Sequence, residues 1–210
     1  MDSNQLMNSQ SGSNPDKPKK KLPAISYNAP VVLTFAFISL FALILNQITG
    51  GASNRLLFSV YRSDFSFFFV IRLVGHSLGH ANWAHFAGNM TLFLLLGPIL
   101  EDKYGSGRLL WMIVVTAAVS GLLNIMFFPH VALLGASGIV FMFIILSSAS
   151  CMVDDRIPLT MILIVVVYLG AELVDAFTKQ DNVSQFTHII GGVCGAIFGF
   201  AFGKKKTDTT

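Results

Sequence analysis

The segment that decides the fold is residues 109–153, which read LLWMIVVTAAVSGLLNIMFFPHVALLGASGIVFMFIILSSASCMV. It contains no Asp, Glu, Lys or Arg, and it is far longer than the roughly 20 apolar residues that one helix needs to cross a bilayer. Pro129 and Gly135 interrupt it, and both residue types commonly mark helix ends. The segment therefore predicts two membrane-spanning helices, at 109–128 and 137–152.

Working outward, four more apolar segments are long enough to span. The connection at 48–79 carries charge and is apolar only briefly, so it is predicted to dip into the membrane interface without crossing. Asn82 stands where it can cap the helix that follows it. The sequence predicts an all-α polytopic membrane protein with six transmembrane helices, the other four lying at 31–47, 83–100, 158–177 and 187–203.

Composition supports this class. Of the 210 residues 53% are hydrophobic and only 12% are charged, about half the share usual in a soluble domain, and the mean hydropathy is +0.66. A disordered chain, a coiled coil and a disulfide scaffold are excluded, and a soluble enzyme is disfavoured. We expect one domain at 30–203, with a disordered polar tail at 1–29 and a basic tail at 204–210. The two cysteines, Cys151 and Cys194, are expected to be inert fillers.

The distribution of positive charge predicts the orientation. With six spans, ten of the 14 Lys and Arg residues fall on the side that also holds both termini. Because cytoplasmic loops carry the excess of Lys and Arg, both termini are predicted to be cytoplasmic, in a multi-pass protein of the cell membrane. The basic clusters flank apolar segments and are not interleaved with aromatic residues, so the lipid bilayer is the expected partner and nucleic acid is not.

A few polar residues lie inside the predicted spans, where they are costly and usually functional. Ser137, His188, His85 and Asn89 come from three different spans and fall at a similar depth below the outer surface. His85 and Asn89 are four residues apart and share a helix face, whereas His80 precedes that helix or points elsewhere. Any one of these residues alone is more often structural. Their convergence favours a site.

Small residues surround two members of this set. His188 is followed at helical spacing by Gly191, Gly195 and Gly199, a stripe that lets two helix backbones approach closely. Ser137 lies in the sequence Gly135-Ala136-Ser137-Gly138, at the start of a predicted helix. A serine that faces a histidine across a close helix contact is the minimal nucleophile and base pair.

At these residues the chain resembles the rhomboid family of intramembrane serine proteases, over roughly 30–203. The similarity is carried by Gly135-Ala136-Ser137-Gly138, by His188 with Gly191 and Gly195, and by the spacing of His80, His85 and Asn89. Gly97, Glu101, Gly105 and Ser106 match the family's acidic turn after the second span. Tyr61-Arg62 stands in the first long loop, where many relatives carry Trp-Arg.

The resemblance implies a rhomboid-like bundle and a role for each site residue. Ser137 would be the nucleophile and His188 the base, with Asn89, His85 and the Ser137 backbone N–H as oxyanion donors. Phe141 would stack on the base. His80, Gly135, Gly138, Gly191 and Gly195 would support the site. No metal and no cofactor are implied, the expected partners are transmembrane protein substrates, and the oligomeric state is left open.

Two other functions remain open. One is an inactive rhomboid-like protein that binds transmembrane helices without cutting them; the intact Ser137 and His188 argue against it. The other is a small transporter with a proton path through Glu172, Asp175 and the histidines. A transporter predicts polar residues through the whole membrane depth, whereas here they gather on the outer side.

Overall fold

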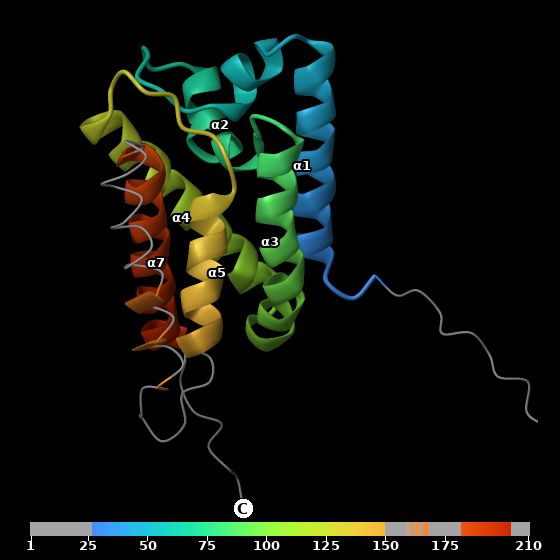
Figure 1. The fold of residues 1–210 in the computed structure, drawn as a ribbon, viewed down its shortest axis with the longest axis vertical. Coiled ribbons are helices and arrows are strands. Elements are labelled where there is room, and N and C mark those ends of the chain that lie inside the picture. Colours follow the sequence, from blue (N-terminus) through green and yellow to red (C-terminus); the bar gives the residue numbers. More distant parts are fainter. Residues whose placement is uncertain (1–26, 150–158, 160–161, 164–165, 168–181, 203–210) are drawn as a thin grey trace, which may run out of the picture.

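The chain folds into a bundle of helices (Figure 1). The computed structural model describes residues 27–149, 159, 162–163, 166–167 and 182–202. The described helices are α1 (Pro30–Ile48), α2 (Phe67–Gly75), α3 (Trp83–Tyr104), α4 (Ser106–Phe127), α5 (Ser137–Ala149) and α7 (Asn182–Phe202), with a π-helical turn η1 (Asn54–Phe58) and a 3₁₀ turn η2 (His76–Leu78). Within these residues the extended structure is limited to one isolated β-bridge, between Val60 and Leu133.

Among the described residues, four helices are long and apolar enough to cross a membrane: α1, α3, α4 and the part of α7 at Gln185–Phe202. The all-helical multi-pass architecture is thus confirmed. α5 is apolar but has only 13 residues within the described part of the chain. The fifth predicted span, at 158–177, is described only at residues 159, 162–163 and 166–167, and Cys151, Glu172 and Asp175 lie outside the described residues. The count of six spans and the cytoplasmic termini stay predictions.

The connection between α1 and α3 holds only short elements. α2 has nine residues, so it is too short to cross the hydrocarbon. The Ser66 side chain accepts from the Phe69 N–H at 3.2 Å and starts α2. Asn82 caps α3, as predicted, by accepting from the His85 N–H at 2.9 Å.

The amino end of α1 is capped from a distant part of the chain. Ala29 precedes the helix and supplies no side-chain cap. Instead the two carboxylate oxygens of Glu101, in the last turn of α3, accept from the N–H groups of Val31 and Val32 at 3.0 Å each. Ser106 donates to the same carboxylate at 2.7 Å. A negative charge on the first turn of a helix is favourable, so Glu101 joins α1 to the α3–α4 turn.

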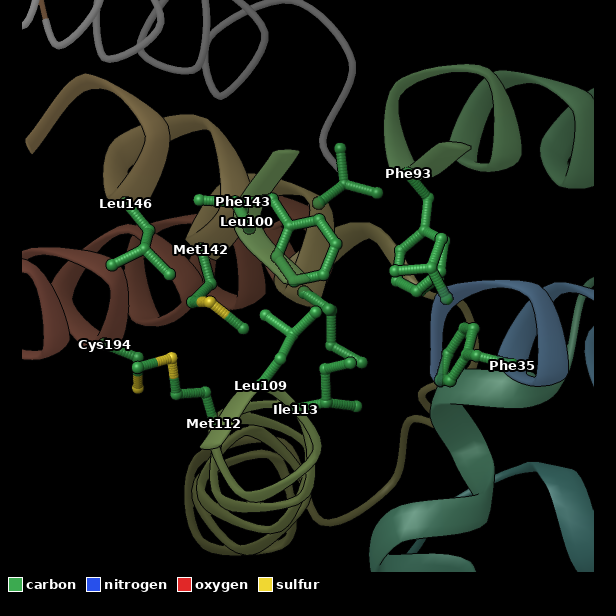
Figure 2. Packing of buried hydrophobic residues seen from close by; sticks show 14 of the residues in the cluster. Phe35, Phe93, Leu100, Leu109, Met112, Ile113, Met142, Phe143, Leu146 and Cys194 are labelled. Carbon is green, nitrogen blue, oxygen red and sulfur yellow. The ribbon is translucent and has the colours of Figure 1, made fainter. Parts of the chain in front are cut away.

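Aromatic stacking forms the centre of the bundle (Figure 2). Phe93 of α3 stacks on Phe35 of α1 at 4.6 Å between ring centroids, and on Phe143 of α5 at 4.9 Å. Leu109, Met112 and Ile113 extend this core from α4, and Cys194 adds to it from α7. Cys194 is a buried free thiol, as its expected filler role requires.

The glycine stripe of α7 packs against α5, as its spacing predicts. A side chain at Gly191 would collide with the Gly138 carbonyl oxygen, and one at Gly195 would lie 2.5 Å from the Met142 carbonyl oxygen. At Gly199 it would lie 2.5 Å from the Ala149 side chain. The two backbones are therefore in direct contact, and this contact sets the distance between α5 and α7.

Candidate active site

The four polar residues singled out from the sequence meet at one cavity. It has a volume of about 300 Å³ and is lined by Ser137 of α5, His188 of α7, and His85 and Asn89 of α3, together with Phe141. Three segments far apart in the chain thus contribute to one site. The structure brings together the nucleophile and base candidates and both proposed oxyanion side chains.

Ser137 lies at the first position of α5, where backbone N–H groups have no partner inside the helix. The turn before it depends on Gly135, whose φ of +126° is one that side-chain-bearing residues rarely adopt. A Cβ on Gly135 would lie 2.8 Å from the His85 ring and 3.8 Å from the Asn89 amide nitrogen. The backbone before Ser137 therefore runs close against the two α3 side chains.

His188 is held by its neighbours on two sides. Its ring stacks on Phe141, with 4.1 Å between ring centroids and 5° between ring planes. One turn along α7, Gly191 touches Gly138, the residue that follows Ser137. The ring plane is therefore set by Phe141, and the distance between the two helices is set by a backbone contact.

Asn89 is buried and its side-chain Nδ2 has no hydrogen-bond partner among the described residues. A buried donor without a partner is costly, and such a group in a cavity is available to a ligand. Asn89 therefore offers a preformed donor beside Ser137.

His80 supports this arrangement from outside the cavity. Its buried ring lies edge-on to His85 at 5.2 Å and to Phe86 at 5.3 Å between centroids. Its backbone carbonyl accepts from Asn54 Nδ2 at 3.1 Å. Burial, with a smaller effect of the neighbouring His85, lowers the pKa of His80 to about 4. The ring is then neutral near pH 7, so it can pack against His85 without repulsion between charges.

The loop between α4 and α5 is fixed by three attachments that the sequence did not reveal. Val60 and Leu133 exchange backbone hydrogen bonds at 2.9 Å in both directions. The Gly135 N–H donates to the His76 carbonyl oxygen at 2.9 Å, and Asn124 Nδ2 donates to the Val131 carbonyl oxygen at 3.0 Å. For Asn124 the available signal in the sequence was an Asn within an otherwise apolar helix. The backbone contacts left no signal in residue type.

In the first long loop the buried arginine is Arg72, whereas Arg62 is exposed. The Arg72 guanidinium lies 4.5 Å from the centre of the Tyr61 ring and donates to Ser63 Oγ at 2.6 Å. The Tyr61 hydroxyl donates to the Arg55 carbonyl oxygen at 3.1 Å. Tyr61 therefore organises this loop through its own ring and hydroxyl, and its neighbour Arg62 remains free to face outward.

A second cavity adjoins the first and shares two residues with it. It measures about 500 Å³ and is lined by Ser137 and His85, by residues 131–134 of the loop before α5, and by Ala81 and Val183. Ser137 is partly exposed between the two cavities. The serine is therefore reachable from the end of the bundle that carries this loop.

Comparison with known proteins identifies the family. A family model of the rhomboid domain matches residues 68–205. The rhomboid protease GluP of Bacillus subtilis is 27% identical over 207 residues, which cover 90% of this chain. Rhomboid-related protein 1 of Caenorhabditis elegans is 29% identical over 61% of this chain, and the rhomboid protease GlpG of Haemophilus influenzae is 32% identical over 34% of it.

The matched regions are only 40%, 39% and 37% of the lengths of those three relatives. The rhomboid match nevertheless covers more than half of this chain, and it includes α3, α5 and α7, which line the cavity. The chain belongs to the rhomboid family.

Proposed function

We propose that this protein is an intramembrane serine endopeptidase that cuts transmembrane protein substrates in or near their membrane-spanning segments. The observation that carries the proposal is the meeting of Ser137, His188 and Asn89 at one cavity, where Asn89 Nδ2 has no hydrogen-bond partner within the described part of the chain. Two of the named relatives are proteases, which supports the same activity. The six-span count, the cytoplasmic termini and a location in the cell membrane are part of the proposal.

In the proposed reaction the Ser137 hydroxyl oxygen attacks the scissile carbonyl carbon while His188 takes its proton. The proton then passes to the leaving amine, and an acyl-enzyme ester remains on Ser137. Water attacks this ester with His188 again as the base, which releases the carboxylate product and restores the serine.

Negative charge develops on the carbonyl oxygen in both steps. Asn89 Nδ2, His85 and the Ser137 backbone N–H are the proposed donors to it. Stacking on Phe141 does part of the orienting work that a carboxylate does in a triad, because it fixes the plane of the His188 ring.

The site must admit both water and an unwound substrate. The adjoining cavity beside residues 131–134 provides room for water next to Ser137. A helix hides its carbonyl groups in hydrogen bonds, so we expect substrates with glycine, proline or small residues near the cut to be preferred.

Labelling by a fluorophosphonate tests the proposal without knowledge of the substrate. The wild type is expected to be labelled, and Ser137→Ala and His188→Ala are expected to lose labelling. Ser148→Ala is the matched control, because Ser148 lies on the same helix about three turns away and does not line the cavity. Labelling of Ser137→Ala at the wild-type rate would refute the nucleophile.

Cleavage of a model transmembrane substrate in liposomes separates the protease from the inactive alternative. The protease proposal expects a cleaved product with the wild type and none with Ser137→Ala. Capture of the intact substrate, with no cleavage under conditions in which Ser137 is labelled, would favour a helix-binding role.

A further inference from the structure

A third cavity touches the second one at Ala132 and carries several cationic and hydrogen-bonding side chains. It measures about 510 Å³, and we name it the cationic cavity. Its lining includes Arg55 and Arg62 from the first long loop, His130 from the loop before α5, and Asn54, Ser59 and Tyr61. None of these residues lines the cavity that holds Ser137 and His188.

No carboxylate of the described part of the chain lines the cationic cavity. The acidic residues of that part are Asp64, Glu101 and Asp102. Glu101 caps the first turn of α1, at the end of that helix opposite to the η1 turn that carries Arg55. Two guanidinium groups and an imidazole around one hollow are therefore suited to an anion.

Tyr61 builds the wall of this cavity. Its hydroxyl holds the Arg55 backbone, and its ring lies against the buried Arg72 guanidinium. The side chains of Arg55 and Arg62 are exposed. The two arginines thus project from a supported backbone, and their guanidinium groups can donate in pairs to a tetrahedral oxyanion.

Exposed apolar side chains indicate where the cationic cavity lies relative to lipid. Leu56 directly follows Arg55 and is 48% exposed, and Val131 directly follows His130 and is 44% exposed. Phe65 and Phe67, in the same first loop, are 84% and 77% exposed. Apolar groups of this kind favour hydrocarbon, so we expect the neighbouring cations to lie at the level of the phosphate groups.

We propose that the cationic cavity binds the phosphate group of an anionic phospholipid. The group recognised is a phosphate ester. Arg55 and Arg62 would bind it together with His130, which lines the same cavity. Because its walls come from both loops that the Val60–Leu133 bridge joins, a bound headgroup would fasten the first loop to the loop leading to Ser137. This inference concerns binding and does not depend on the proposed protease activity.

Native mass spectrometry of the purified full chain in neutral detergent tests the proposal. The probes are phosphatidylglycerol and phosphatidylcholine, offered together, and inorganic phosphate as a competitor. The wild type is expected to retain phosphatidylglycerol preferentially. The double variant Arg55→Gln/Arg62→Gln is expected to lose about 10-fold or more of that retention, because charge-assisted bonds to phosphate are removed.

The matched control is Lys103→Gln/Arg108→Gln, which removes two exposed positive charges at the opposite end of the bundle. It is expected to bind as the wild type does, and thermal unfolding checks that both double variants are folded. Equal loss in both double variants would overturn the site, because it would show attraction by net charge alone. Retention at the wild-type level by Arg55→Gln/Arg62→Gln would overturn it directly.

Inorganic phosphate distinguishes the two sources of the same chemistry. The lipid proposal expects that millimolar phosphate leaves phosphatidylglycerol bound, because the acyl chains add apolar contact beside Leu56 and Val131. Displacement of the lipid by phosphate, with phosphate binding lost in Arg55→Gln/Arg62→Gln, would overturn the lipid assignment in favour of a free anion.

Discussion

The rings of Phe141 and His188 lie face to face, with 4.1 Å between their centroids and 5° between their planes. Phe141 belongs to α5 and lies one turn after Ser137, whereas His188 belongs to α7. The helix that carries the serine therefore also orients the histidine. The first prediction follows from this stacking.

Removing the ring at Phe141 should slow the reaction more than it harms the fold. Stacked aromatic pairs contribute about 0.5–1.5 kcal/mol, so Phe141→Ala should lower kcat by about 3- to 10-fold through a less ordered His188. Phe141→Tyr keeps the ring and should stay near the wild-type rate. Cleavage kinetics in liposomes measure both, and equal rates for Phe141→Ala and Phe141→Tyr would contradict the orienting role.

Asn89→Ala should reduce kcat by about 10- to 1000-fold, by analogy with the loss of one oxyanion donor. Its thermal unfolding temperature should not fall, because the Nδ2 atom has no hydrogen-bond partner among the described residues that the substitution could break. Asn46→Ala is the control, since Asn46 is a buried Asn on α1 that does not line the cavity. It should cut at the wild-type rate. A slow but marginally stable Asn89→Ala would point to a structural role for Asn89.

Two adjacent glycines of α7 should respond in opposite ways to alanine. Gly191→Ala places a Cβ against the Gly138 carbonyl oxygen, so it should cost about 1–3 kcal/mol or more and separate Ser137 from His188. Gly192→Ala meets only Ile145 Cγ1 at an ordinary 3.7 Å, so it should be neutral or stabilise the helix by up to about 1 kcal/mol. Thermal unfolding in detergent and fluorophosphonate labelling measure the pair. Similar destabilisation by both would mean that the α5–α7 contact is not as close as described.

Glu101→Gln should destabilise the bundle by about 1–3 kcal/mol, because it weakens bonds to two backbone N–H groups and to Ser106. Asp102→Asn removes the neighbouring, exposed carboxylate and should have little effect. Denaturant or thermal unfolding reports the difference. A Glu101→Gln variant as stable as Asp102→Asn would show that the cap of α1 contributes nothing.

Much of the bundle could be predicted because apolar length and glycine spacing are local properties. The segments at 31–47, 83–100 and 109–128 correspond closely to α1, α3 and α4. The stripe beginning at His188 contacts α5 because 3.6-residue periodicity alone decides which residues share a face.

That the site residues come together could likewise be inferred from their similar depth in the predicted spans. The contacts that hold the loop before Ser137 in place could not be inferred. Ser137, His188, His85 and Asn89 gather at one cavity, because they lie at a similar depth on the facing sides of packed helices. The attachments of the loop before Ser137 run through backbone groups of Val60, Leu133 and His76, and any residue type offers those groups. Glu101 illustrates the same limit, because its charge was visible in the sequence but its partners, the amide groups of a helix 69 and 70 residues away, were not.

The cap that Glu101 places on α1 has a consequence for the folding of this protein during translation. Glu101, which caps the first turn of α1, is translated about seventy residues after that turn. Until that residue arrives, the first-turn amide groups of α1 have only water or headgroups as partners. The first turn of α1 can therefore reach its final hydrogen-bonding arrangement only after α3 has been made.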